Sequence, residues 1–196
     1  YVAERAAAMR SAGRAVLIGV NTVEASEQIS AALARRGLAH NVLNAQHLEE
    51  EADIVAQAGE ADAISVVTNM AGRGTDIKLS RSVRAAGGLH VVLAEVLPSA
   101  RLERQLYGRA SRQGDPGSHE FAHALEERAV TEGAAAPLRR ALRRVSRLSP
   151  VAAGRVFRVW IRHHQRLRER QKARVRKQLL KADMERDEVF LFSRLR

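Results

Sequence analysis

The chain has no cysteine, so it has neither a disulfide framework nor a thiolate that could bind a metal or act as a nucleophile. Aromatic residues make up only 4% of its 196 residues, which predicts a core packed mainly by alanine, leucine and valine. No apolar run reaches about 18 residues, the length that a membrane-spanning helix needs. The phosphate-binding sequence G-x-x-x-x-G-K-[ST] and an acidic Walker B strand are also missing, so we expect the chain by itself to hydrolyse no nucleoside triphosphate.

Charge is distributed unevenly along the chain. Residues 1–136 contain 14 Lys/Arg and 17 Asp/Glu, a net charge of −3, whereas residues 137–196 contain 19 and 5, a net charge of +14. We therefore expect a slightly acidic globular domain at residues 1–130 and a basic helical segment at residues 131–196. The chain begins with Tyr1 inside a helical pattern, without a signal peptide, which indicates a fragment or a trimmed chain.

Strand-like and helix-like stretches alternate over the first 125 residues. Short β-branched apolar runs predict strands, and stretches of helical character that end at a glycine predict helices. This alternation indicates an α/β fold with a parallel, doubly wound sheet flanked by helices. We expect strands at residues 15–20, 40–44, 63–68, 89–93 and 119–125, and helices at 1–12, 22–36, 47–58, 80–86 and 98–110.

The last third of the chain differs from the rest in composition and in its predicted secondary structure. A linker is expected at residues 133–137, a basic helix at 138–148, and one long helix from about residue 151 to 189, which would extend over about 60 Å. Three interpretations of this segment stay open: a scaffold helix whose apolar stripe packs on the globular domain, a surface for anionic lipid or acidic loops, and a nucleic-acid arm. The residues of the apolar stripe are Val156, Trp160, Leu167, Val175 and Leu179.

A glycine-rich loop follows the strand expected at residues 63–68. Residues 68–77 read TNMAGRGTDI, in which Gly72 and Gly74 let the backbone approach a phosphate. Arg73 supplies a guanidinium cation that can donate two parallel hydrogen bonds. Asp76 can accept a hydrogen bond from a ribose hydroxyl or hold Arg73 in place. Because open α/β sheets bind ligands at the carboxyl ends of their strands, this loop is a candidate ligand site. The alternatives are a plain turn and, for Asp76, a helix cap.

A second polar stretch, QLYGRASRQGD, occupies residues 105–115. Arg109 and Arg112 lie three residues apart in a helical pattern, which places them on one face of the expected helix. Guanidinium groups on one face suit the charge that spreads over phosphate oxygens during phosphoryl transfer. The alternative is a solvated basic helix face. No histidine pair has metal-ligand spacing, so we expect no metal site in this chain.

Together the two stretches resemble motifs V and VI of the second RecA-like domain of a superfamily 2 motor ATPase. The sequences of these motifs are similar to those of the SecA family, the motors of bacterial preprotein export. The resemblance covers most of residues 14–125, and the sequence RKQLL at residues 176–180 is similar to the family's long scaffold helix. It implies a RecA-like sheet flanked by helices, followed by an α-helical scaffold segment with one long basic helix.

The resemblance also implies a role for each site residue. Arg112 would be an arginine finger for the γ-phosphate, with Arg109 in support. Mg and ATP are the implied cofactors, with the metal ligands supplied by an N-terminal ATPase domain, in cis or in trans. The residues assigned to the nucleotide are Asp76, Arg73, Gly74, Gly72 and Gln105.

The implied partners, besides that N-terminal domain, are the SecYEG channel and unfolded preprotein, with anionic lipid as a further partner. Only two aromatic residues, Phe157 and Trp160, lie in the densest basic part of the tail, which argues against nucleic acid as a partner. The resemblance implies a cytoplasmic protein that is peripheral at the inner face of the plasma membrane. The chain would be the C-terminal motor half of an ATPase that drives preprotein export.

Two alternatives to this function stay open. The first is the C-terminal half of a superfamily 2 nucleic-acid helicase, which shares the motif plan and would use the basic tail. The second is a degenerate, non-catalytic remnant. It rests on departures from the family pattern: Thr-Glu-Arg-His-Glu-Ser is replaced by AEVLPS at residues 94–99, and Ser111 stands in place of a glycine.

Overall fold

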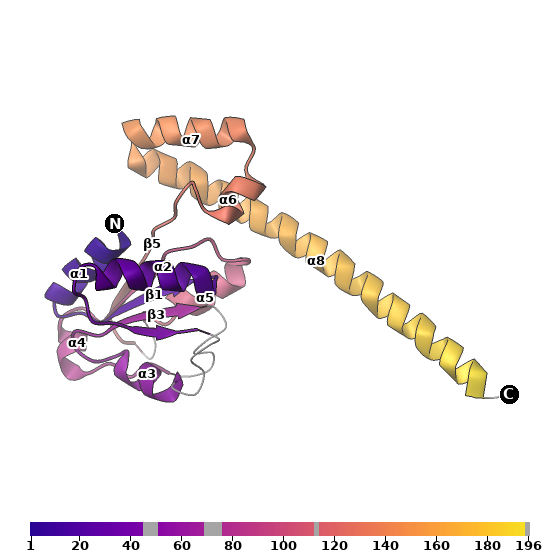
Figure 1. Cartoon of the computed structure of the whole chain (residues 1–196), viewed down its shortest axis with the longest axis horizontal. Helices are drawn as coiled ribbons and strands as arrows, with labels where there is room; N and C mark the ends of the chain where they lie inside the picture. The colour runs from indigo at the N-terminus through magenta and orange to yellow at the C-terminus, as the bar shows by residue number, and fades with distance from the viewer. Residues whose placement is uncertain (45–50, 69–75, 112–113, 195–196) are drawn as a thin grey trace. The chain divides into compact units, whose positions relative to one another are not determined.

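The computed structural model describes residues 1–44, 51–68, 76–111 and 114–194 (Figure 1). It divides into two compact units, Tyr1–Ala141 and Leu142–Arg196. The first unit contains a β-sheet with helices on both faces, and the second is entirely helical. Each unit is described by itself below.

The sheet of the first unit has five strands, all parallel, in the order β2-β3-β1-β4-β5. Every residue of β1, β3 and β4 is buried, as expected for central strands that are covered on both faces. This arrangement confirms the predicted α/β, RecA-like fold. The strands are β1 (Val16–Val20), β2 (Asn41–Leu43), β3 (Ile64–Thr68), β4 (Leu89–Leu93) and β5 (Gly117–Phe121).

Helices cover both faces of the sheet (Figure 1). On one face, α1 (Val2–Ser11) and α2 (Val23–Ala34) pack in a core cluster with alternate residues of β1. On the other face, α3 (Glu51–Gln57), α4 (Arg81–Ala85) and α5 (Ala100–Tyr107) contribute to a second cluster with the intervening strand residues. The two clusters reflect the period of two by which side chains alternate across a strand.

The chain leaves β1 and β4 in opposite directions. After β1 it passes through α2 on one face and reaches β2 at one edge of the sheet. After β4 it passes through α5 on the opposite face and reaches β5 at the other edge. The carboxyl ends of these two neighbouring strands therefore form a topological switch point, where doubly wound sheets bind ligands.

Two elements of the first unit, β5 and α5, end at least three residues earlier than expected. The last strand was expected at residues 119–125, but β5 begins at Gly117 and ends at Phe121, because β4, with which it pairs, ends at Leu93. The fifth helix was expected to reach residue 110, but α5 ends at Tyr107. Gly108 follows as its C-cap, and the next amide donates to the Leu106 carbonyl in a tight turn.

A helix that the sequence analysis did not predict follows the sheet. It is α6 (Arg128–Gly133), with a hydrogen-bonded ion pair between Arg128 and Glu132 at 2.6 Å. The expected linker at residues 133–137 is shorter, because α7 (Ala136–Leu148) already includes Pro137. Proline fits there because the first turn of a helix has no internal partner for its N–H.

The second unit is dominated by α8 (Pro150–Arg194), a helix of 45 residues that confirms the predicted long basic helix. The break between α7 and α8 lies at Ser149, whose Oγ accepts from the Ala152 amide at 3.3 Å. The stripe that was interpreted as packing surface is largely exposed, since Val175 and Leu179 have 52% and 59% of their surface accessible. Within the residues described here, no helix combines the length and apolarity that crossing a membrane requires.

Candidate nucleotide site

The helix α5 and the turn that follows it lie directly on the sheet because two glycines leave room for them. A Cβ atom at Gly19 of β1 would overlap the side chain of Leu106, and one at Gly117 of β5 would overlap the carbonyl of Ala110. At the start of α5, the Ser99 hydroxyl accepts from the Leu102 amide at 3.3 Å and so caps the helix. The cap and the close packing together fix both ends of the helix that carries the second polar motif.

The residues expected from this motif lie at the end of α5 and beyond it. Gln105 is exposed on α5, and Arg109 is partly buried in the turn after Gly108. Arg109 therefore lies beyond the end of α5 and not within the helix that was expected to reach residue 110. Arg112 itself lies outside the described residues.

The glycine-rich loop follows β3, as predicted, but most of it lies outside the described residues, including Gly72, Arg73 and Gly74. Asp76 is the first described residue after this gap; it is partly buried and precedes the buried residue Ile77. The N-cap of α4 is Ser80, so the alternative that Asp76 caps this helix is wrong. Since β3 and β1 are neighbours, the loop starts at the same edge of the sheet as the switch point.

The sequence analysis missed one residue at the switch point, Glu95. It follows β4, and its Oε2 accepts hydrogen bonds from the backbone N–H groups of Asn21 at 2.8 Å and Thr22 at 3.1 Å. Both amides lie at the start of α2, where the helix dipole favours an anion. A sequence signal did exist, because Glu95 and Ser99 are the two residues of AEVLPS that agree with the family pattern.

His90 is part of the packed interior of the sheet. His90 is buried in β4, where its Nδ1 lies 2.7 Å from the Ser118 hydroxyl and its Nε2 lies 3.5 Å from a carboxylate oxygen of Glu120. Burial lowers the pKa of His90 and outweighs the opposing effect of Glu120. Over the part of the chain that the structure describes, no group of three or more histidine, cysteine or acidic residues could hold a metal ion.

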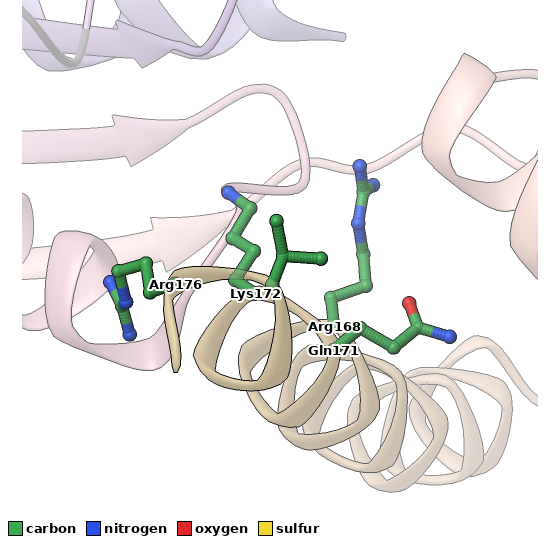
Figure 2. Close-up of a pocket in the computed structure, with 5 residues that line it drawn as sticks. Arg168, Gln171, Lys172 and Arg176 are labelled. Carbon is green, nitrogen blue, oxygen red and sulfur yellow. The ribbon is translucent and has the colours of Figure 1, made fainter. Parts of the chain in front are cut away.

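The second unit has a pocket of a different kind. It is formed along α8, and Figure 2 shows Arg168 and Lys172 extending from the same side of that helix. Its other lining residues are Gln171, Val175 and Arg176. Three of its five lining residues are cations, and none of the residues predicted for the nucleotide lines it.

Comparison with known proteins identifies relatives of this chain. A sequence profile described as the SecA P-loop domain matches residues 1–83 and 78–147. Protein translocase subunit SecA 2 of Nitrosospira multiformis is 43% identical over 185 residues, which cover 94% of this chain and 28% of that protein. Protein translocase subunit SecA of Christiangramia forsetii is 56% identical over 119 residues, which cover 61% of this chain and 11% of that protein.

A third relative, protein translocase subunit SecA 3 of Magnetococcus marinus, is 45% identical over 175 residues, which cover 88% of this chain and 26% of that protein. The chain thus spans between about a tenth and about three tenths of the length of these relatives. The profile covers well over half of the chain. The observed parallel sheet and the two polar stretches agree with this match, and the chain therefore belongs to the SecA family.

Proposed function

We propose that this chain is the C-terminal motor half of a SecA-like protein translocase. It supplies the loop at residues 68–77 and the motif at residues 105–115 to an ATP site that it shares with an N-terminal ATPase domain. The observation that supports this most is the placement of α5, which brings the start of the second motif onto the sheet beside the switch point. The relatives are named as protein translocase subunits, which supports the transport function.

In this proposal each half contributes a different part of the chemistry. The N-terminal domain provides the phosphate loop and the Mg ligands, which the sequence of this chain lacks. Arg112, supported by Arg109, neutralises charge on the γ-phosphate, while Asp76, Arg73, Gly72, Gly74 and Gln105 contact the nucleotide or transmit its state. Domain 1–130 forms one wall of the ATP cleft, and segment 131–196 converts its closure into movement of α8.

The proposed partners follow from the proposed function. They are the N-terminal ATPase domain, the SecYEG channel, unfolded preprotein and anionic lipid, and the proposed location is the inner face of the plasma membrane. The exposed basic residues of α8, among them Arg168, Lys172 and Arg176, support contact with an anionic surface.

The test uses this chain mixed with the N-terminal ATPase part of a SecA relative. Phosphate release from Mg-ATP is measured for the wild-type mixture and for mixtures that contain Arg112→Ala or Arg109→Ala. A finger that stabilises the transition state contributes about 10³-fold or more to turnover, so Arg112→Ala is expected to abolish measurable release. Arg101→Ala is the matched control, since Arg101 is exposed on α5 outside the proposed site.

The degenerate remnant is the second candidate function. The observation that favours it is the segment at residues 94–99, where Val96 and Leu97 stand at family Arg and His positions and are buried in the core. If the remnant is correct, the wild-type mixture releases phosphate no faster than the N-terminal part alone, and Arg112→Ala changes nothing.

A further inference from the structure

The segment that connects β4 to α5, residues 94–99, is held to the sheet by two carboxylates. The first is Glu95, whose side chain crosses from the end of β4 to the start of α2. Besides the two backbone amides, the Thr22 hydroxyl lies 3.2 Å from its Oε2, and the same hydroxyl accepts from the Ala25 amide at 3.1 Å. Glu95 thus satisfies the amide of Thr22, the N-cap of α2, which has no partner within the helix, and the amide of Asn21, the residue before it.

This contact lies at the switch point between β1 and β4. Anions bind well at helix N-termini, because the N–H groups point outward and the dipole favours negative charge. Here the chain's own carboxylate takes that place, so the start of α2 is used to hold the segment that leads into α5. A ligand's phosphate would have to displace Glu95 to bind the same amides.

The second carboxylate is Glu127, which precedes α6. One of its oxygens accepts from the Val96 amide at 2.7 Å, and the other accepts from the Ala124 amide at 2.7 Å. Hydrogen bonds to a charged acceptor are shorter and about twice as strong as neutral ones. Glu127 therefore ties the residue next to Glu95 to the chain that follows β5.

Between the two carboxylates the segment is apolar and buried. Val96 and Leu97 are 4% and 1% exposed, and Ser99 then caps α5. The start of α5 is consequently fixed by polar contacts on two sides and by packing. The helix is about 12 Å long, so a tilt of about 5° at its start would move its far end, near Gln105 and Arg109, by about 1 Å.

We propose that Glu95 is a positioning residue, assisted by Glu127, that sets the orientation of α5 and through it the placement of the arginines of the second motif. The proposal rests on the proposed function, since it assigns these carboxylates a role in ATP turnover. A misplacement of about 1 Å at a reacting group can reduce turnover about 100-fold, although the residue that causes it touches no substrate. The departures of AEVLPS from the family pattern leave Glu95 and the α5 cap residue Ser99 unchanged.

The experiment compares Glu95→Ala, Glu95→Gln and the control Glu27→Ala, which removes an exposed carboxylate of α2. In the chain alone, amide hydrogen exchange at Asn21 and Thr22 is expected to become at least 10-fold faster in Glu95→Ala. In the mixture with the N-terminal part, kcat for ATP is expected to fall at least 10-fold with KM changed less than threefold. Glu95→Gln retains an acceptor oxygen and should recover most of both effects, and Glu127→Ala should lower kcat in the same direction.

Each outcome separates this inference from the proposed function. If the wild-type mixture turns over ATP and Glu95→Ala has the same kcat, the positioning role is wrong while the proposed function stands. Unchanged amide exchange at Asn21 and Thr22 in Glu95→Ala also overturns it. A wild-type mixture without turnover overturns the proposed function, and the role in turnover with it. A fall in kcat that Glu95→Gln fails to recover assigns the effect to the charge and overturns positioning by hydrogen bonds.

Discussion

The two units of this chain are stabilised in different ways. In Tyr1–Ala141, three strands are buried along their whole length, and glycines in β1 and β5 allow α5 and the turn after it to lie directly on the sheet. In Leu142–Arg196, most of the described residues of α8 are exposed, and Lys and Arg side chains give this helix a positively charged surface. The first unit therefore defines its own geometry through packing, whereas the second has a surface whose use depends on a partner. Changes of the same kind should have unequal effects in the two units.

The largest expected difference is for leucine truncation. Leu97→Ala removes a side chain that is 1% exposed and should destabilise the sheet by about 3 kcal/mol, because it leaves a cavity. Leu179→Ala, at a position that is 59% exposed on α8, should change stability by less than about 0.5 kcal/mol. Amide hydrogen exchange of the β1 and β4 amides measures the first effect, and exchange along α8 measures the second. Equal losses at both positions would contradict the contrast.

The next difference concerns glycine. In Gly117→Ala the new methyl group would meet the backbone carbonyl of Ala110, which cannot move aside like the end of a flexible side chain. We expect a loss of about 2 kcal/mol in the stability of the sheet, measured by urea unfolding with exchange of the β4 amides as the local probe. Gly37→Ala is unsuitable as a control because Gly37 has a positive φ of 66°. A neutral effect of Gly117→Ala would mean that the turn after α5, which contains Ala110, is not packed tightly against β5.

Both units contain a histidine whose pKa is lowered, mainly by burial: His90 in the sheet and His164 in α8. The unfolded state, with an ordinary histidine pKa of about 6.5, binds a proton more readily than the folded state. Folding stability should therefore be unaffected above that pH and should decrease as pH falls below it. The groups that surround His90 are Glu120, Arg5 and Arg14, of which Glu120 opposes the shift.

The effect should be larger for His90, which is 2% exposed, than for the partly exposed His164. Exchange of the β4 amides between pH 7.5 and 5.5 tests the first histidine. Fluorescence of Trp160, whose ring stacks on His164 at a centroid distance of 5.1 Å, tests the second. His90→Gln and His164→Gln should each flatten the corresponding profile. A pH dependence that survives both substitutions would assign it to other groups.

The smallest expected effect has the opposite sign. Gly154 lies within α8, and a methyl group added there would meet no atom within 4 Å. Gly154→Ala should stabilise the helical unit by about 0.8 kcal/mol, because alanine loses less backbone entropy in a helix. The helicity measured by circular dichroism during thermal unfolding reports this gain. Destabilisation by Gly154→Ala would indicate that this face of α8 is in contact with another surface.

Much of the fold was predictable from local patterns. The runs AVLIGV, AISVV and LHVVL indicated buried strands, and the helices expected to begin at residues 22 and 98 begin within two residues of those positions. The start of β5 was not predictable, because the strand is set by pairing with β4 and begins at a glycine. The helix α6 was also missed, although the spacing of Arg128 and Glu132 by four residues is a helical signal.

The candidate site was predictable only in part. The motif sequences indicated the loop after β3 and the stretch at the end of α5. The loop follows the expected strand, and the stretch begins in the expected helix. The roles of Asp76, Gln105 and Arg109 stay predictions, as do those of Arg73 and Arg112, which lie outside the described residues. Agreement with the family pattern marked Glu95, but its contacts could not be predicted from sequence because its partners, Asn21 and Thr22, lie more than 70 residues away along the chain.

The central claim is that this chain provides one half of an ATP site that another domain completes. The most direct measurement is phosphate release from Mg-ATP by the chain alone, by the N-terminal ATPase part of a SecA relative alone, and by the two together. We expect no release by the chain alone and faster release by the mixture than by the N-terminal part alone. Release by the chain alone, or a mixture no faster than the N-terminal part although the two parts associate, would contradict the account.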